Sequence, residues 1–421
     1  MLRIIKKIIP KKLFEIAQPA YHYLLALTGA IVYRFPSRKI KVVAVTGTKG
    51  KTSTVEFVNT ILEEAGKKTA LLGTLRFKIG DESKPNLYKM TMPGRMFVQS
   101  FLRKAVNAGC EYVVMEISSE AVKQSRNKFI DLNALIFTNL APEHIESHGS
   151  YEKYVEAKLS IAKQLEKSNK NDKVIIVNSD DKEAEKFLQI NIQNKVKYSL
   201  DDVKNIIMTE DYTKFTYKGV EIETKLVGKF NIYNILGAIK YAESEDIDLS
   251  IIKNALLKLK EIKGRAQIID EGQDYKVVVD YAHTPDSLKA IYETFSNSKK
   301  IGVLGNCGGG RDKWKRKEMA EIADKYCEEI ILTDEDPYDD EPREIVEDMA
   351  KHFKIHKPQI VMDRREAIAI TFKKAKKGDV VIITGKGTDP YIMRKNGIKE
   401  KWSDAEVARE ELVELVKSKK L

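Results

Sequence analysis

Short runs of apolar residues alternate with stretches of helical periodicity along most of the chain. The apolar runs cover residues 41–45, 69–72, 112–115, 134–137 and 174–177, and then residues 277–279, 301–304, 329–332 and 380–383. Apolar strands that alternate with helices are typical of a parallel sheet wrapped by helices. The pattern therefore predicts an α/β protein with two such sheets, the second beginning near Lys276.

The stretch between the two sets of runs has a different pattern. Residues 199–224 are polar and predict a small antiparallel excursion, whereas GKFNIYNILGAIKYA from Gly228 predicts a helix. A chain of 421 residues is long enough for more than one core. We expect a basic, apolar arm at residues 1–40, a central domain with a mainly parallel sheet at 41–262, and a C-terminal Rossmann-like α/β domain at 263–421.

The net charge of +11 is concentrated near the start of the chain. Residues 1–41 contain nine Lys or Arg and one acid, which leaves a net charge of only about +3 for the rest. This distribution gives no reason to expect a nucleic-acid partner. Three cysteines without CxxC spacing favour a reducing compartment, so we expect a cytoplasmic protein, and we expect a monomer.

The basic arm also contains apolar residues. Leucine and isoleucine recur at helical spacing among the lysines of residues 2–9, and residues 20–35 form an apolar run that is shorter than the ~20 residues needed to span a bilayer. Two interpretations remain open. The apolar face packs on the enzyme, or residues 1–35 lie on an anionic membrane surface.

A candidate phosphate-binding loop follows the first apolar run. The sequence VVAVTGTKGKTS predicts a strand, a tight loop and the start of a helix, although the strict pattern G-x-x-x-x-G-K-[ST] would need glycine at Val45. Lys51 can reach the outer phosphates of ATP, and the Thr52 hydroxyl can bind Mg²⁺. The loop residues expected to bind ATP are Gly47, Thr48, Lys49, Gly50, Lys51, Thr52 and Ser53.

Two further strands end in side chains that suit a metal beside the phosphates. YVVMEISSEA ends its apolar run with Glu116, and ALIFTNLAPEHIESHGS continues past its strand with Asn139 and His144. An acid at the rim of a core usually has a charged partner. We therefore expect Glu116 to face the phosphate site.

These stretches belong to a series of motifs whose order resembles that of the Mur ligases, and most closely the UDP-N-acetylmuramoyl-tripeptide synthetase type. The series is TGTKGKTS, TMP, MEISS, FTNL-x-x-EH, HGS, GKFNIYN, KGRAQ, VVDYAHTPDSL, GNCGGGRDKWKR, DEDPYDDEP and TGKGTD. The resemblance covers roughly residues 41–415 and implies an ATP- and Mg²⁺-dependent amide ligase. In that family an acceptor carboxylate becomes an acyl phosphate, and the amine of an amino acid then displaces phosphate.

The resemblance also implies roles for individual residues. The implied catalytic and metal-binding residues are Lys51, Thr52, Glu116, His144 and Lys158, with Lys158 carbamylated. ATP contacts beyond the loop are implied for Asn139, Asn231, Asn234, Arg265 and Asp280. Acceptor contacts are implied for Thr91, Ser118, Gln124 and Arg126. Contacts to the incoming amino acid are implied for Arg311, Glu335, Asp336, Tyr338, Gly385 and Asp389. Because the ATP contacts come from two domains, we expect the domains to close before reaction.

The chain departs from the family pattern in two informative places. Only the arm precedes the phosphate loop, where the family usually has a UDP-binding domain, so a muramoyl-peptide acceptor is expected while UDP recognition stays open. The DNPR motif of diaminopimelate-adding relatives is replaced by residues 335–338, EDPY. Loss of that arginine, with surplus negative charge from Asp334, Asp336, Asp339 and Asp340, favours a basic amino acid such as lysine or ornithine. The alternative is that these acids only solvate a loop.

Other interpretations keep part of this chemistry. The same ligase could act on a lipid-linked precursor, a folate polyglutamate chain or an amino-acid polymer. A nucleotide-dependent switch or binding module is the alternative from another class, and the matches at Lys158, Arg265 and Asp280 argue against it.

Overall fold

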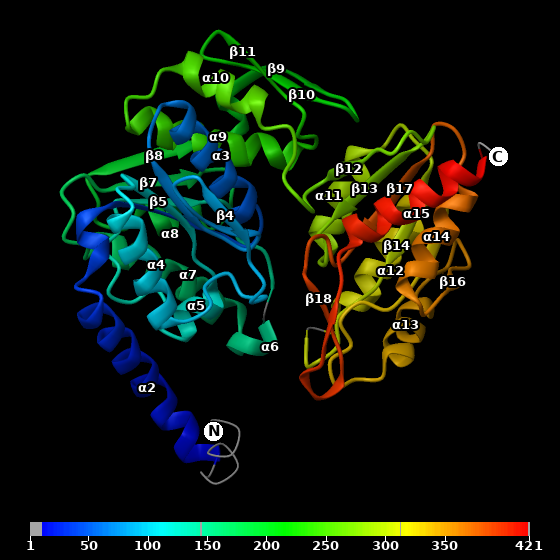
Figure 1. Ribbon diagram of the computed structural model, residues 1–421, viewed down its shortest axis with the longest axis horizontal. Coiled ribbons are helices and arrows are strands. Elements are labelled where there is room, and N and C mark those ends of the chain that lie inside the picture. The colour runs from blue at the N-terminus through cyan, green and yellow to red at the C-terminus, as the bar shows by residue number, and fades with distance from the viewer. Residues whose placement is uncertain (1–10, 144, 312, 420–421) are drawn as a thin grey trace. The chain divides into compact units, whose positions relative to one another are not determined.

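A computed structural model describes residues 11–143, 145–311 and 313–419 of the chain (Figure 1). His144 and the apolar pattern at residues 2–9 therefore lie outside the described residues. The chain forms two compact units, one from Met1–Pro142, Ser150–Asp202 and Tyr233–Leu256, the other from Glu143–Gly149, Val203–Ile232 and Leu257–Leu421. Residues 203–232 thus group with the C-terminal part of the chain.

The first unit is built on an eight-stranded sheet with the order β4-β3-β2-β5-β1-β6-β7-β8. Its strands are β1 (Lys41–Thr46), β2 (Thr69–Leu72), β3 (Arg76–Ile79), β4 (Glu82–Pro85), β5 (Tyr112–Glu116), β6 (Ala134–Phe137), β7 (Val174–Asn178) and β8 (Asn194–Tyr198). From β2 to β8 all neighbours are parallel, and β3 and β4 add an antiparallel edge. The register sets Val45 beside Glu116 and Thr46 beside Phe137, so the loops after β1, β5 and β6 begin side by side.

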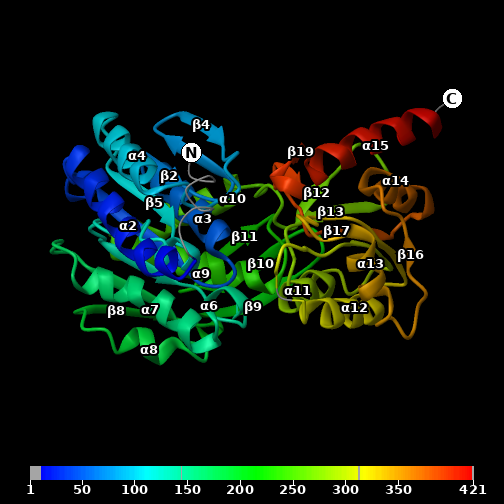
Figure 2. The same cartoon turned by 90° about the horizontal axis from the view of Figure 1, so that it is seen from below.

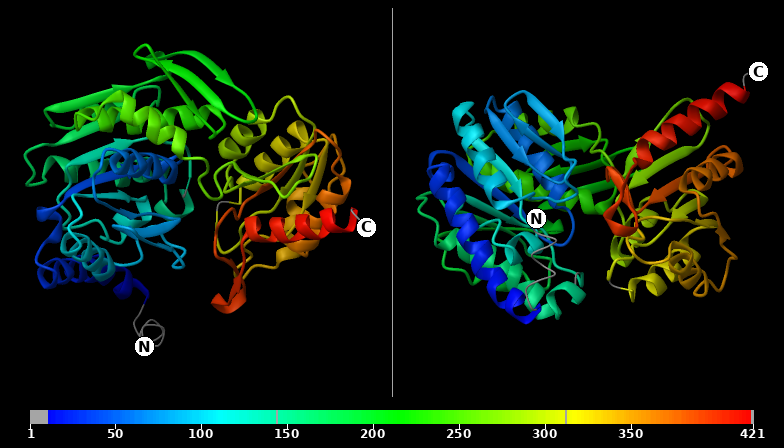
Figure 3. Two further views of the ribbon diagram at one scale, coloured as in Figure 1. Left: turned by 45° about the horizontal axis from the view of Figure 1, so that its top comes forward. Right: turned by 60° about the horizontal axis from the view of Figure 1, so that its bottom comes forward.

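Helices cover both faces of this sheet. They are α2 (Lys11–Val32), α3 (Lys51–Glu64), α4 (Arg95–Asn107), α5 (Ser119–Lys123), α7 (Tyr151–Glu166), α8 (Ala184–Leu188), α9 (Lys229–Ser244) and α10 (Leu249–Lys258). Alternate strand residues such as Val42 and Ala44 pack with apolar residues of α4 and α7. α9 crosses the other face so closely that a Cβ at Gly237 would lie 3.2 Å from Ile136. Figure 3 shows α2 alongside α4.

The second unit contains a six-stranded sheet with the order β12-β13-β17-β14-β15-β16. Its strands are β12 (Gln267–Ile269), β13 (Lys276–Asp280), β14 (Lys300–Leu304), β15 (Glu329–Leu332), β16 (Gln359–Ile360) and β17 (Val380–Thr384). Its helices are α11 (Pro285–Thr294), α12 (Lys315–Tyr326), α13 (Pro342–Ala350), α14 (Arg364–Lys374) and α15 (Asp404–Lys419). Val278 faces α11 and α12, whereas Val277 and Val279 face α14 and α15, so each face has its own core (Figure 2).

Smaller elements complete the second unit. The predicted antiparallel excursion is present as β9 (Val203–Met208), β10 (Thr213–Tyr217) and β11 (Val220–Thr224), and β18 (Tyr391–Met393) pairs with β19 (Lys399–Lys401). The short α6 (Ile145–His148) precedes α7 along the chain. Within the described ranges, no helix is both long enough and apolar enough to cross a membrane. The two-sheet α/β fold predicted from the apolar runs is confirmed.

Candidate active site

The loop between β1 and α3 depends on two glycines. Gly47 has φ 153° and Gly50 has φ 82°, a region that residues with a Cβ rarely occupy. A Cβ on Gly47 would lie 1.9 Å from Oγ1 of Thr138, and a Cβ on Gly50 would lie 2.1 Å from Oδ1 of Asn234. The loop is therefore closed tightly against β6 and α9, and its backbone N–H groups lead into the N-terminus of α3.

Neighbouring polar groups hold this loop. Asn139 accepts a hydrogen bond from the Lys49 N–H (2.9 Å) through Oδ1, and its main-chain oxygen accepts from the Thr48 N–H (2.8 Å). The Thr48 hydroxyl lies 2.9 Å from the Tyr154 hydroxyl on α7. Thr138 donates to the carbonyl oxygen of Lys49 at 2.6 Å. Asn139, which the sequence assigns to ATP, thus lies against the loop and shapes it.

Two lysines converge on the same loop carbonyl. Lys51 Nζ donates to the carbonyl oxygens of Gly47 and Thr48, both at 2.8 Å, and Lys158 Nζ donates to the Gly47 oxygen at 2.7 Å. Lys158 is only 1% exposed and lies 5.0 Å from the centre of the Tyr154 ring. The structure therefore brings together the phosphate loop and the lysine that the sequence singled out on α7.

Glu116, at the end of β5, is held from two sides. Its carboxylate accepts from the Thr52 hydroxyl (3.1 Å), the Thr74 hydroxyl (2.9 Å) and the Thr74 N–H (2.7 Å). The Thr74 hydroxyl also lies 3.0 Å from that of Thr91. A hydrogen-bonded line thus runs from the phosphate loop to a residue expected to contact the acceptor. Thr74 carried no signal in the sequence, since only the folded sheet places it beside Glu116.

The oxygen atoms of Thr52 and Glu116 suit a hard cation. Mg²⁺ prefers oxygen ligands and is usually held by one or two protein groups together with phosphate oxygens and water. Among residues 11–143, 145–311 and 313–419, no group of three or more His, Cys, Asp or Glu side chains forms a metal cluster. The donor set that is present therefore fits Mg²⁺ shared with a triphosphate, not a site built from protein ligands alone.

The residues expected to contact the acceptor lie around α5. Ser118 caps α5, where its hydroxyl accepts from the Ala121 N–H at 3.2 Å. Arg126 donates to the Gln124 side-chain oxygen (2.7 Å) and to the main-chain oxygen of Met92 (2.6 Å). Gln124 and Arg126 therefore form one connected group with the segment that follows Thr91.

The other residues expected to contact ATP divide between the units. Asn234 belongs to the first unit and meets Gly50, whereas Asn231, in the second, donates to the Val227 oxygen at 2.8 Å. In the second unit, the Arg265 guanidinium lies 4.8 Å from the centre of the Tyr281 ring. Asp280, at the end of β13, accepts from the N–H groups of Ala266 and Ala282, both at 2.7 Å.

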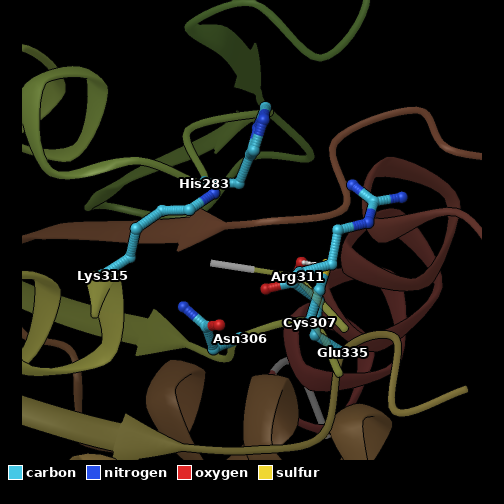
Figure 4. A pocket seen from close by; sticks show the side chains of 6 residues that line it. All are labelled: His283, Asn306, Cys307, Arg311, Lys315 and Glu335. Carbon is cyan, nitrogen blue, oxygen red and sulfur yellow. Dashed lines mark hydrogen bonds between the residues drawn. The ribbon is translucent and has the colours of Figure 1, made fainter. Parts of the chain in front are cut away.

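A small polar pocket lies within the second unit (Figure 4). It is lined by His283, Asn306, Cys307, Arg311, Lys315 and Glu335. Glu335 is 2% exposed and accepts from the Cys307 thiol at 3.0 Å through one oxygen, while its other oxygen is buried without a hydrogen bond among the described residues. Burial raises the pKa of the Glu335 carboxyl, and the nearby charges of Arg364 and Lys386 oppose this increase only in part. Gly385 makes room for Glu335, because a Cβ there would lie 2.4 Å from the carboxylate.

The neighbouring acids differ from the expectation of surplus negative charge. Lys386, which is fully buried, lies 2.9 Å from Asp336 and 3.0 Å from Asp389. Burial disfavours the charged ammonium, but the two carboxylates outweigh that effect and raise the pKa of Lys386. Asp334 pairs with Arg394. The expected surplus was wrong for Asp334 and Asp336, because arginine and lysine side chains distant in the sequence pair with them. Glu335 is a fully enclosed acid without such a pair within the described residues.

Tyr338 occupies the position of the missing arginine. Its hydroxyl accepts from Arg311 at 3.2 Å, and the Arg311 guanidinium lies 5.7 Å from the ring centre. The remaining two acids of this loop accept main-chain hydrogen bonds, Asp339 from Asn396 (2.8 Å) and Asp340 from Gly309 (3.1 Å). Glu335 and Asp336 of the EDPY segment are buried, and Glu335 lines the pocket, so the segment is not a solvated loop.

A glycine-rich phosphate loop between a parallel strand and a helix, with a carboxylate at the end of the adjacent strand, defines a P-loop nucleotide-binding protein. Two family models match the chain, the Mur ligase middle domain over residues 45–242 and the "Mur ligase, glutamate ligase domain" over residues 264–387. The chain belongs to the Mur ligase family. It is an ATP-dependent ligase that forms amide bonds, and the family uses ATP with Mg²⁺.

Several relatives resemble the chain over most of its length. UDP-N-acetylmuramoyl-L-alanyl-D-glutamate–2,6-diaminopimelate ligases from Syntrophomonas wolfei and Bacillus cereus are 37% and 36% identical to it, and each match covers 92% of this chain and 81% of the relative. A solved structure of a ligase of that name superposes with a TM-score of 0.61 at 28% identity, covering 90% of this chain and 79% of the other. The resemblance to the tripeptide-synthetase type, first inferred from motifs, is confirmed.

Proposed function

We propose that the chain adds a basic amino acid, such as lysine, to the peptide of a muramoyl-peptide cell-wall precursor. The acceptor carboxylate takes the γ-phosphoryl group of ATP and releases ADP. The amine of the amino acid then forms the new C–N bond and displaces phosphate. The names of the relatives support a muramoyl L-alanyl-D-glutamate acceptor.

The hydrogen-bonded line Thr52–Glu116–Thr74–Thr91 carries this proposal. It places the phosphate loop and the acceptor segment in one network within the first unit, which suits transfer of a phosphoryl group to an acceptor carboxylate. Bound Mg²⁺ would neutralise charge on the phosphates there. Lys51, whose Nζ lies at the loop, and the loop N–H groups would stabilise negative charge on the transferred group.

The proposed donor differs from the diaminopimelate in the names of the relatives. A diamino diacid needs a cation for its distal carboxylate, but Tyr338 stands where the DNPR motif has its arginine. Arg311, which lies nearby, already donates a hydrogen bond to the Tyr338 hydroxyl. Glu335 supplies a buried carboxylate oxygen without a hydrogen bond, which suits an ammonium group. A basic side chain would meet that need.

An amino-acid panel tests the donor. Purified protein is incubated with ATP, Mg²⁺, UDP-N-acetylmuramoyl-L-alanyl-D-glutamate and single amino acids, and product mass and phosphate release are measured. Incorporation of lysine or ornithine above diaminopimelate supports the proposal. Preferred incorporation of diaminopimelate would refute the donor assignment, and phosphate release without any new amide would favour a nucleotide-dependent switch.

We also propose that Lys158 is carbamylated in the active enzyme. Its amine is buried and directed at the phosphate loop, where an anionic carbamate would supply an oxygen ligand for a cation. Lys158→Ala should lose most activity and regain part of it with a short-chain carboxylate such as acetate. An inactive variant that no carboxylate rescues, although its thermal unfolding matches that of the wild type, would argue against carbamylation.

The exposed apolar residues of α2, the first described helix, support the proposal of a peripheral contact with an anionic membrane surface. One face of α2 packs beside α4 and buries His22, Ala26 and Ala30. The opposite face leaves large apolar side chains in solvent, namely Tyr21 (49%), Leu24 (60%), Ile31 (58%) and Val32 (57%). The sequence before and at the start of α2 carries Arg3, Lys6, Lys7, Lys11 and Lys12. Cations close in sequence to an exposed apolar face suit an anionic lipid surface, so both interpretations of the arm are supported.

Vesicle co-sedimentation tests this contact. The wild type should sediment with vesicles that contain phosphatidylglycerol more than with phosphatidylcholine alone, and Leu24→Asp with Ile31→Asp should reduce that binding. Leu257→Asp, on α10, replaces a side chain of similar exposure (53%) and is the control. Equal sedimentation of the wild type and the α2 double variant would contradict the proposal.

A further inference from the structure

We propose that Arg95 joins Arg126 in a two-guanidinium site that binds an oxyanion of the acceptor, either a carboxylate or a phosphate. This inference rests on the proposed function and adds Arg95 to the acceptor site. Arg95 is the first residue of α4, and Arg126 follows α5.

Both guanidinium groups are fixed on one residue. Arg95 Nε donates to the main-chain oxygen of Gln124 at 2.7 Å, and Arg126 donates to the Gln124 side-chain oxygen at the same distance. Arg126 is only 9% exposed and is further held by the Met92 carbonyl oxygen. Gln124 therefore holds both cations through hydrogen bonds.

Each guanidinium keeps a buried N–H group for which the described part of the chain offers no acceptor. These groups are Nη2 of Arg95 and Nε of Arg126. Neither arginine forms an ion pair with a carboxylate among the described residues, although buried arginines usually have such a partner. Burial lowers the pKa of Arg126, and the charge of Arg95 lowers it further, while Glu120 opposes this only in part. A buried cation whose charge is further disfavoured by a neighbouring cation is a good site for an anion.

The chemistry of the site selects the ligand class. Arginine presents N–H groups in a planar fork that matches carboxylate and phosphate oxygens. Arg95 is also the first residue of α4, and the N–H groups and positive dipole end of a helix N-terminus favour an anion nearby. Thr91 directly precedes Met92, whose carbonyl oxygen holds Arg126, and Gln124 accepts a hydrogen bond from Arg126. Thr91 and Gln124 are both expected to contact the acceptor. An anionic part of the acceptor is therefore the ligand that this site fits.

Acceptor kinetics of the full chain test the site. Arg95→Gln should raise the acceptor KM about 10-fold or more, because a charge-assisted hydrogen bond is lost, while kcat and the KM for ATP stay near wild type. Added KCl should raise the acceptor KM of the wild type more than that of Arg95→Gln. Lys104→Gln, which removes an exposed charge from the same helix, should leave the acceptor KM unchanged.

Three acceptors identify the source of the anion. These are the UDP-linked muramoyl dipeptide, its 1-phosphate and the phosphate-free muramoyl dipeptide. A KM increase with all three assigns the site to a carboxylate, and an increase only with the phosphate-bearing acceptors assigns it to phosphate. Arg95→Lys should recover part of the affinity, and a matching thermal unfolding curve separates binding from folding.

A failure of the Arg95 inference can be told apart from a failure of the proposed function. A wild-type protein that ligates a muramoyl peptide with the same acceptor KM as Arg95→Gln would overturn this inference alone. A wild-type protein that makes no amide with any muramoyl peptide would instead refute the proposed function.

Discussion

Two buried carboxylates of this enzyme differ in how their oxygens are satisfied. Glu116, 1% exposed, accepts three hydrogen bonds from Thr52 and Thr74. Glu335, 2% exposed, accepts one from a thiol, which is a weak donor, and its other oxygen has no hydrogen bond from the residues that the structure describes. Burying a charge without such compensation is costly. The burial of Glu335 is therefore better explained by ligand binding than by a contribution to the stability of the fold.

This difference predicts how stability depends on pH at Glu335. Burial raises the pKa of its carboxyl in the folded protein, so folding favours the protonated form. The folded state then gains stability from Glu335 only below the pKa of the unfolded chain, and that gain is lost as pH rises through the folded pKa. Glu335→Gln should therefore raise Tm at pH 7, and the increase should shrink as the pH falls toward 4, the usual carboxyl range.

Thermal unfolding at several pH values measures the predicted change in stability. The KM for lysine measures the predicted loss of amino-acid binding. We expect the more stable Glu335→Gln to use lysine poorly, since it lacks the carboxylate. Glu341→Gln alters an acid at the N-terminus of α13 and is a control outside the pocket. If the Tm difference between Glu335→Gln and the wild type were less favourable to the variant at pH 7 than at pH 4, this explanation would be contradicted.

Motif residues could be predicted from the sequence, but their partners could not. The sequence identified Glu116, Lys158 and Glu335, because residue type and order carry that information. It gave no indication of Thr74 or Arg95, whose importance comes from contacts made only in the folded chain. Lys386 belongs to the TGKGTD motif, but its pairing with Asp336 could not be predicted. The error about surplus acidic charge at Asp334 and Asp336 has the same origin, since the cations that pair with them lie far along the chain.

At the scale of elements, burial decided which strands could be predicted. β1 and β17 are continuous apolar runs buried along most of their length, and such runs predict strands of a parallel sheet. β4 and β19 are fully exposed and polar, and β16 has only two residues. These edge strands form because a neighbouring strand is already in place, so their own sequence contains no apolar pattern.

Two glycines with positive φ flank α3, and we expect alanine substitutions at the two positions to differ in their cost to stability. Gly50 begins the helix at φ 82°, and a Cβ there would collide with Asn234, whereas Gly66 follows the helix at φ 75° with no atom within 4 Å. Gly66→Ala should cost about 1 kcal/mol of unfolding free energy through backbone strain alone. Gly50→Ala should cost more and should also raise the KM for ATP.

Urea unfolding and ATP kinetics of the two alanine variants measure this contrast. Removing the colliding side chain in Gly50→Ala with Asn234→Ala should recover part of the lost stability, which identifies the collision as the cause. Equal effects of Gly50→Ala and Gly66→Ala on both measurements would show that the loop tolerates a side chain, against our expectation.

Helices α14 and α15 are joined by an ion pair that is almost completely buried. Arg364 donates two hydrogen bonds of 2.8 Å to Asp404, and the two side chains are 1% and 0% exposed. Asp404→Ala would leave the guanidinium charge buried and should cost about 3–5 kcal/mol of unfolding free energy.

An exposed pair between the same two helices provides the control. Arg365 and Glu410 are 45% and 58% exposed, so Glu410→Ala should cost only about 0–1 kcal/mol. Urea unfolding gives both values. Similar losses for the two variants would mean that burial does not set the strength of these pairs.

At the scale of the whole molecule, the residues expected to bind ATP are shared by two units with separate cores. The phosphate loop belongs to the first unit, and Arg265 and Asp280 belong to the second. Each unit is stabilised by its own sheet and helices. A ligase built in this way can move its units without breaking either core, which is consistent with closure around ATP before an acyl phosphate forms.

Closure predicts that a residue of the second unit contributes to ATP binding. Arg265 stacks on Tyr281 and donates a hydrogen bond to the carbonyl oxygen of Gly264. Arg265→Gln should raise the KM for ATP about 10-fold or more, since a guanidinium that pairs with phosphate is lost. Arg409→Gln removes an arginine of α15 with 44% exposure from the same unit and should leave the KM for ATP unchanged. If Arg265→Gln binds and uses ATP like the wild type, the second unit does not supply this contact, and closure would have to act through other residues.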